Sequence, residues 1–148
     1  MYEKNQSHGH EVGYMPWQQP EIDRTKSVWI SPWYWYVIKP SHLSLGKYTD
    51  IGAFTLLNCA QGIVIEDHVQ IGSHCSLNSV NTIDGTSGEI RICENAKIGS
   101  HCVIMPNVTI GRNSKIGANS FVNRSIPDNQ VWFGNPVHSH RLIDNNLY

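Results

Sequence analysis

Three histidines of the chain recur at one position of a six-residue sequence period. His68, His74 and His101 each hold the fourth place of their hexad. A neutral imidazole accepts a proton near pH 7, so each could act as a base or positioning group, or simply lie solvated in a turn. His68 and His74 are six residues apart, which places them on different sides of the structure that the period predicts. Zinc needs convergent ligands, so the sequence predicts no metal site.

Aliphatic residues carry the period itself and recur every six positions between two register slips. They are Leu45, Ile51, Leu57, Ile65, Ile71, Leu77, Ile83, Ile92, Ile98, Ile104, Ile110, Ile116 and Val122. Glycine follows the aliphatic residue in six of these thirteen hexads. The residue four places after the aliphatic residue is mostly small or apolar. A period of six fits neither an α-helix nor a hairpin fold. It fits a short strand and a turn, repeated three times in each coil.

Such hexads predict an all-β fold, a parallel β-helix of triangular section with about four to five coils stacked at the ~4.8 Å strand spacing. The aliphatic residue and the small residue before it are two apart, so both point inward. Cys75 and Cys102 hold small inward positions and are expected to pack in the core, whereas Cys59 and Cys93 fall off these positions and the period leaves their role open. The glycines and Asn-rich tetrads are expected at corners that need positive φ. The slips near 62–63 and at 84–91 predict loops leaving the coil.

Composition excludes several other classes of protein. The chain has 148 residues, of which 16% are charged, and a net charge of −1, which is not the basic footprint of a nucleic-acid-binding protein. No apolar run approaches the ~20 residues of a membrane span, and the N-terminal stretch lacks a signal-peptide core, so a cytoplasmic protein is expected. The four cysteines form no CxxC pair, which argues against a zinc ribbon or a redox motif.

The first 37 residues differ from the repeat because they are rich in tryptophan and tyrosine. The segment VWISPWYWYVI at 28–38 is expected to cap the open first coil, with an aromatic sugar-stacking surface as the alternative. The predicted organisation is a capping segment (1–37), a hexapeptide-repeat β-helix (38–127) and a short C-terminal extension (128–148). The run at 132–136 is expected to turn the chain back.

The run IGSHCVIMPNVTIGRNSKIGANSFVNRSIPDNQVWFGNP at 98–136 resembles the hexapeptide-repeat acyltransferases, whose fold is a left-handed parallel β-helix. The resemblance covers residues 43–143. It is strongest to the branch that acetylates maltose, galactosides and cell-surface sugars, with its IG-x6-P-x-VTIG run, Ile-Pro and Gly-Asn-Pro. The resemblance implies a homotrimer that uses acetyl-CoA, with active sites in clefts between subunits.

The resemblance also implies a coenzyme A channel at matching positions of this chain. Its residues are Ser100, Ala118, Asn123, Arg124, His138 and Arg141. Arg124 stands where the family usually has lysine, and both side chains suit a phosphate. His138 stands where the family commonly has arginine, which weakens that contact.

The positions of the family's catalytic base hold no base in this chain. Thr82 stands where the sugar O-acetyltransferases have their histidine, and Asn78 stands where the serine acetyltransferases have theirs. The substitute expected from the sequence is His101, as a base or positioning group beside Ser100. Asp84, at the mouth of the second loop, is expected to receive or relay a proton.

The number of hexads between these residues predicts how they are arranged. With three faces per coil, the hexads at 57, 77 and 98 share one face. The same arithmetic places His101 one coil beyond Asn78 and His74 on a different face.

An amine acceptor needs less catalytic help than a hydroxyl, because a neutral amine attacks a thioester readily. The missing base therefore favours acetyl transfer from acetyl-CoA to the amino group of a nucleotide-linked amino sugar for cell-surface polysaccharide. The alternatives are a sugar O-acetyltransferase and a non-catalytic β-helix that serves binding or assembly.

Overall fold

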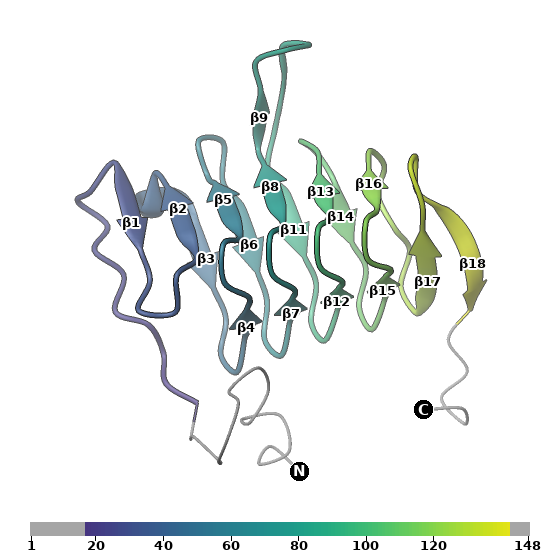
Figure 1. Ribbon diagram of the computed structural model, residues 1–148, viewed down its shortest axis with the longest axis horizontal. Helices are drawn as coiled ribbons and strands as arrows, with labels where there is room; N and C mark the ends of the chain where they lie inside the picture. Colours follow the sequence, from purple (N-terminus) through teal and green to yellow (C-terminus); the bar gives the residue numbers. More distant parts are fainter. Residues whose placement is uncertain (1–16, 143–148) are drawn as a thin grey trace.

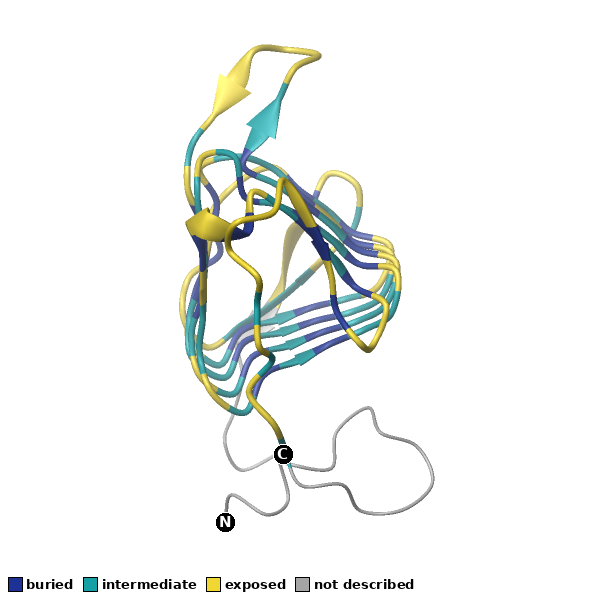
Figure 2. Ribbon diagram, turned by 90° about the vertical axis from the view of Figure 1, so that its left-hand side faces the viewer, coloured by how far each residue is buried: buried dark blue, intermediate teal, exposed yellow. Residues whose placement is uncertain are grey.

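Short strands follow one another around the three sides of a prism, and successive coils stack along its long axis (Figures 1 and 2). The computed structural model describes residues 17–142. Three mainly parallel sheets form the sides, and each strand pairs with the strand one coil before or after it. The chain is thus a left-handed parallel β-helix of about five coils, as the hexapeptide period predicts.

Each sheet collects one strand from every coil. Sheet A contains β1 (Val28–Ile30), β2 (Tyr36–Ile38), β5 (Leu56–Asn58), β8 (Ser76–Asn78), β13 (Val103–Ile104) and β16 (Phe121–Val122). Sheet B contains β3 (Leu43–Leu45), β6 (Ile63–Ile65), β11 (Ile90–Ile92) and β14 (Thr109–Ile110). Sheet C contains β4 (Asp50–Ile51), β7 (Gln70–Ile71), β12 (Lys97–Ile98), β15 (Lys115–Ile116), β17 (Gln130–Phe133) and β18 (His138–Leu142).

The turns between sheets form three corners that recur in every coil. We call residues 46–49, 66–69, 93–96 and 111–114 the B–C corner, and residues 52–55, 72–75, 99–102 and 117–120 the C–A corner. The turns from sheet A to sheet B form the A–B corner, which includes a short 3-10 helix (Pro40–His42) and the projecting hairpin of β9 (Val80–Asn81) and β10 (Thr86–Ser87).

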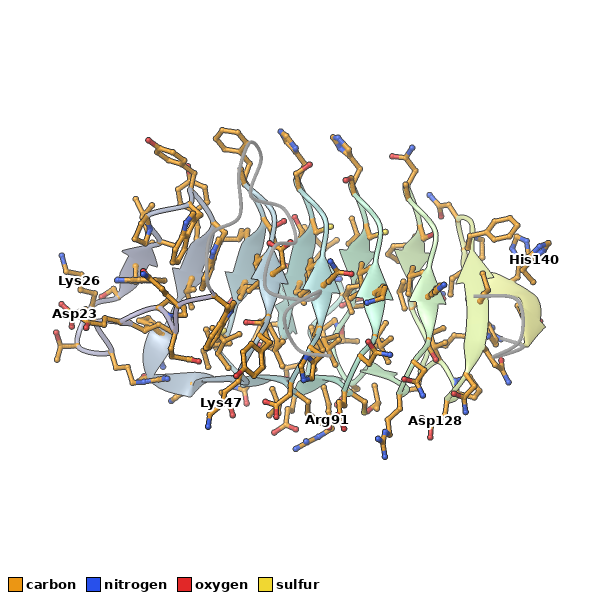
Figure 3. The ribbon with its side chains drawn as sticks, turned by 90° about the horizontal axis from the view of Figure 1, so that it is seen from below. Asp23, Lys26, Lys47, Arg91, Asp128 and His140 are labelled. Atoms are coloured by element: carbon orange, nitrogen blue, oxygen red, sulfur yellow. The ribbon has the colours of Figure 1, made fainter. Side chains whose placement is uncertain are left out.

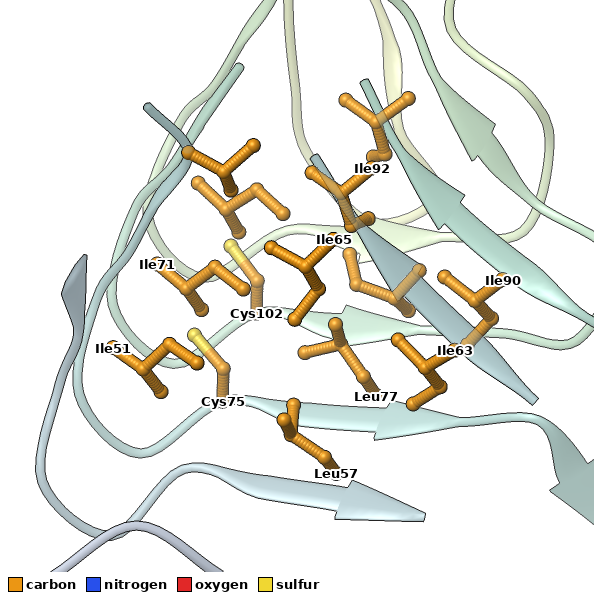
Figure 4. Packing of buried hydrophobic residues seen from close by; sticks show 14 of the residues in the cluster. Ile51, Leu57, Ile63, Ile65, Ile71, Cys75, Leu77, Ile90, Ile92 and Cys102 are labelled. Carbon is orange, nitrogen blue, oxygen red and sulfur yellow. The ribbon is translucent and has the colours of Figure 1, made fainter. Parts of the chain in front are cut away.

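The interior of the prism is filled by the residues that the period places inward (Figure 4). All nine small residues expected there are buried: Thr49, Thr55, Val69, Cys75, Ala96, Cys102, Val108, Ser114 and Ser120. Aliphatic side chains stack on aliphatic side chains between coils, as Ile51 does on Ile71 in the register of β4 and β7. Cys59, which the period leaves undecided, is fully buried.

The corner geometry differs from the prediction in which residues carry positive φ. The left-handed conformation falls on the residue two places after the repeat glycine, for example Asn113 (φ 58°) and Asn119 (φ 60°), and not on the glycine. Glycine is required for another reason. A Cβ at Gly72 would lie 2.6 Å from the backbone N of Ser100, and one at Gly99 would lie 2.6 Å from that of Ala118. The next coil therefore leaves no room for a side chain.

The two register slips have different structures. The slip near 62–63 is a tight turn closed by the Gly62 N–H, which donates to the Cys59 carbonyl at 2.9 Å, and it forms no loop. The second slip is the β9–β10 hairpin, which projects from one corner in both Figures 1 and 2. Ile83 lies on this hairpin and is 92% exposed, so the prediction that it belongs to the inward repeat is wrong.

The aromatic N-terminal segment lies across the open end of the first coil (Figure 2). Trp29 and Trp35 are buried, with ring centroids 5.3 Å apart in an edge-to-face arrangement. The Arg24 guanidinium donates hydrogen bonds to the carbonyls of Pro40 (2.7 Å) and Leu43 (2.6 Å), which ties the segment to the first turn. These contacts cover core residues that the first coil would otherwise expose.

Parallel pairing between coils begins at β2, which pairs with β5, and ends at β17, which pairs with β15. β18 then returns antiparallel to β17, which closes the far end. Within residues 17–142, no helix is long and apolar enough to cross a membrane.

Candidate active site

His101 lies at the C–A corner, with its ring exposed at the outer edge of the prism. Its ring stacks on that of His74 one coil earlier, with centroids 4.8 Å apart and planes within 7°. Phe54 continues the row, its ring 5.1 Å from His74. The backbone positions the pair, because the His101 N–H donates to the Ser73 carbonyl at 3.0 Å. Two imidazoles are therefore presented side by side from successive coils.

The predicted face of His101 is wrong, and the cause is Ile83. The sequence period counts Ile83 as one hexad, but this residue belongs to the projecting hairpin and occupies no side of the prism. Removing it shifts every later hexad by one face. Leu77 consequently pairs with Ile104, while Ile98 pairs with Ile71. His74 and His101 thus share a corner, where the sequence analysis separated them.

Asn78 and Asp84 lie on the opposite edge of sheet A from His101. Asn78 is half-buried at the end of β8, beside Asn58 of the previous coil. Asp84 is exposed on the hairpin, where its Oδ1 accepts hydrogen bonds from the Thr86 hydroxyl (2.7 Å) and the Thr86 N–H (3.0 Å). These bonds hold the pKa of Asp84 below its ordinary value, so this carboxylate is a weak proton acceptor. One subunit does not bring His101, Asn78 and Asp84 together.

The structure brings together two of the residues expected to line a coenzyme A channel. Ser100 and Ala118 follow the repeat glycines of consecutive coils at the C–A corner, and the Asn119 N–H donates to the Ser100 carbonyl at 3.0 Å. Asn123 is exposed just after β16, at the other edge of sheet A.

Arg124 and His138 meet at a second location, where they line one open cavity of about 530 Å³. Trp132 and the Asn135–Pro136 turn form other parts of its wall. The His138 and His140 rings flank Phe133, with centroids 5.2 and 5.0 Å from it, at the C-terminal end of the prism (Figure 3). The backbone of Arg141 lies opposite Val131, while its side chain is outside the described part of the structure.

Sequence reasoning missed a further polar feature on the outer side of sheet C. Lys97 and Lys115 face outward in direct cross-strand register, and a groove of about 370 Å³ passes beside them. Both lysines immediately precede an inward isoleucine and are three unbroken hexads apart, so the period by itself places them side by side. In residues 17–142, no group of three or more His, Cys, Asp or Glu side chains is arranged to hold a metal ion.

The comparisons with known proteins agree with the fold. Residues 89–124 match the family model described as bacterial transferase hexapeptide (six repeats). The galactoside O-acetyltransferase of Escherichia coli (strain K12) is 35% identical over an alignment that covers 97% of this chain and 76% of that protein.

Two solved structures are similar over most of the chain. A galactoside acetyltransferase in complex with coenzyme A is 32% identical, with a TM-score of 0.70, over 81% of this chain and 64% of that one. A hexapeptide-repeat acetyltransferase from Vibrio cholerae in complex with acetyl-CoA is 26% identical, with a TM-score of 0.71, over 77% and 67%. The chain therefore belongs to the hexapeptide-repeat acetyltransferase family, in its sugar acetyltransferase branch.

Proposed function

We propose that the protein transfers the acetyl group of acetyl-CoA to the amino group of a nucleotide-linked amino sugar used for cell-surface polysaccharide. The observation that most directly supports this proposal is the β9–β10 hairpin, which stands where the family's sugar O-acetyltransferases have their catalytic histidine. Thr82 is exposed there, and the only carboxylate on the hairpin, Asp84, already accepts two hydrogen bonds from Thr86. A hydroxyl acceptor needs a base to remove its proton, whereas a neutral amine attacks without one.

The proposed reaction needs the protein mainly to align its two substrates. The amine nitrogen attacks the thioester carbonyl carbon, a C–N bond forms, and the C–S bond breaks. One amine proton leaves and the coenzyme departs as the free thiol. His101, beside Ser100, serves as a positioning group for this attack.

The coenzyme is proposed to lie along Ser100 and Ala118 and to reach the cavity of Arg124 and His138. Arg124→Ala should raise the KM for acetyl-CoA more than it lowers kcat, because a phosphate contact binds ground and transition states equally. Arg112→Ala is the matched control, since Arg112 pairs with Glu94 at 3.1 Å on the B–C corner. An unchanged KM in the Arg124 variant would remove this residue from the coenzyme site.

A homotrimer with active sites between subunits is part of the proposal. The outer side of sheet A exposes Val28 (50%), Ile30 (56%) and Val103 (36%), which suits burial against a second subunit. Such packing would also let His101 of one subunit approach the hairpin of its neighbour. Light scattering should give three times the chain mass at micromolar concentration, and a monomer mass would contradict the assembly.

Sugar O-acetylation is the second candidate, and the relative named a galactoside O-acetyltransferase favours it. A panel of nucleotide-linked amino sugars and simple sugars, assayed with acetyl-CoA by release of free thiol, separates the two. The amine proposal expects faster acetylation of amino sugars and a rate that follows amine deprotonation as pH rises. Equal rates with simple sugar hydroxyls would overturn it.

A further inference from the structure

A row of polar side chains runs along the outer side of sheet C, one from each coil. Asp50, Gln70, Lys97 and Lys115 lie side by side in strand register. Charge changes along the row, from a carboxylate in the first coil to two lysines in the third and fourth. The row is consequently basic at one end only.

The groove beside this row has a floor made of backbone. Gly72 and Gly99 follow the inward isoleucines of β7 and β12 and line the groove. They carry no side chain because the next coil leaves no space for a Cβ. No side chain narrows the groove at these two positions, and Lys97 and Lys115 line it from the strands.

The two lysines are held together at an electrostatic cost. Like charges directly opposite each other across a strand pair are destabilising. Lys97 is half-buried, its Nζ donates to the Gln70 Oε1 at 2.9 Å, and burial followed by the charge of Lys115 lowers its pKa. An anion bound between the two ammonium groups would remove this repulsion.

The position of the groove relates it to the proposed reaction. Gly99 lines the groove and is followed directly by Ser100, which faces the proposed coenzyme channel at the C–A corner. Arg124 and His138, by contrast, line a separate cavity with none of the groove's residues. The basic end of the groove therefore provides a second anionic subsite next to the transfer site.

We propose that Lys97 and Lys115 bind the diphosphate of the nucleotide-linked acceptor, which lies in this groove with its sugar directed towards the C–A corner. The assignment of this diphosphate to the acceptor rests on the proposed function. The flexible, strongly hydrated ammonium groups suit phosphate oxygens as point charges, and charge-assisted hydrogen bonds to phosphate are among the stronger ones.

The test is calorimetric titration of the coenzyme-free, full-length protein with UDP and with dTDP. At least one should bind, and Lys97→Gln and Lys115→Gln should each weaken binding about tenfold or more. Lys97→Arg and Lys115→Arg, which keep the charge, should retain more affinity than the glutamine variants. Lys47→Gln is the matched control, because Lys47 is an exposed lysine at the B–C corner.

The glutamine variants should melt no lower than the wild type, since each removes a like-charge contact. A second titration with saturating coenzyme A tests whether the groove binds the diphosphate of the acceptor or that of coenzyme A. The nucleotide should still bind when coenzyme A is present. Displacement of the nucleotide by coenzyme A, unchanged affinity in both glutamine variants, or no binding of either nucleotide would each overturn the proposal.

These readouts are independent of acetyl transfer. Nucleotide binding that depends on both lysines, in a protein that acetylates no amino sugar, would support the groove and contradict the proposed function. If amino sugars are acetylated and neither glutamine substitution changes the kinetics, the proposed function is supported and the role of the groove is contradicted.

Discussion

The B–C and C–A corners have the same backbone turn in every coil, and their side chains at the left-handed position differ most in the third coil, where Asn95 stands at the B–C corner and His101 at the C–A corner. At the B–C corner, Asn95 donates to Asn113 at 2.7 Å and Asn113 donates to Asn129 at 3.0 Å, which forms a ladder of amides. At the C–A corner, His101 holds the place equivalent to Asn95, and His74 holds the place equivalent to His68. Both C–A rings are exposed.

This difference separates structural from chemical use of one turn. Asparagine tolerates positive φ, and the amide ladder satisfies much of its own hydrogen-bonding capacity between coils. Stacked imidazoles present ring nitrogens at their edges instead. In the third coil, the B–C corner thus serves coil stacking through Asn95, and the C–A corner offers the His101 ring to a ligand. Exposed ion pairs also lie outside the C–A corner, for example that of Arg91 with Glu66 at 3.3 Å. In Figure 3, Lys47, Arg91 and Asp128 follow one side of the prism.

The largest expected effect comes from the interior that both corners share. Ile104→Ala should lower the free energy of unfolding by ~2–5 kcal/mol, because it removes fully buried apolar volume between Leu77 and Val122 and leaves a cavity. Thermal or chemical denaturation of the purified variant measures this loss. A melting temperature equal to that of the wild type would contradict the inward register.

The next effect distinguishes the two stacked histidines. His101→Asn should lower kcat about ten- to a hundredfold, below the full contribution of a general base, because His101 is proposed to position an amine acceptor. Asparagine holds the same corner position at Asn119, so stability should change little.

His74→Asn is the matched control, since it removes the stacking partner but leaves the ring beside Ser100. It should lower kcat less than His101→Asn. An equal loss in both variants would show that the stack, and not His101 itself, supports the reaction. A loss of less than about tenfold in His101→Asn would remove the proposed role of this residue.

The smallest effect concerns the amide ladder. Asn113→Ala should destabilise the protein by about 1–2 kcal/mol, because it breaks hydrogen bonds to Asn95 and Asn129 and places alanine at φ 58°. Its kcat should match the wild type. A kinetic defect without a stability loss would reverse the roles assigned to the two corners.

Much of the fold could be predicted because the repeat is local. Residues two apart on a short strand share a side, so the period alone identifies inward residues such as Val69 and Ala96. Cys59 escaped the pattern because it lies in the turn of the two-residue slip, where spacing no longer reports direction. The burial of Trp29 and Trp35 was likewise foreseeable from their apolar surface at an open end.

The candidate site was less predictable, because it depends on which coils lie next to each other. Ser100 and Ala118 are close because only ordinary hexads separate them. His74 and His101 are separated by the hairpin, so the count of hexads between them gave the wrong face. A hydrophobic residue on a projecting hairpin, such as Ile83, looks like a core residue when only its spacing is considered.

The sequence by itself determined the coil, most of its inward residues and the family. Only the tertiary structure placed His74 against His101. The physical reason is that side-chain direction within a hexad depends on neighbouring residues, whereas alignment between coils depends on hydrogen bonds between strands about 16–27 residues apart. Insertions change that separation without disturbing the strands they connect.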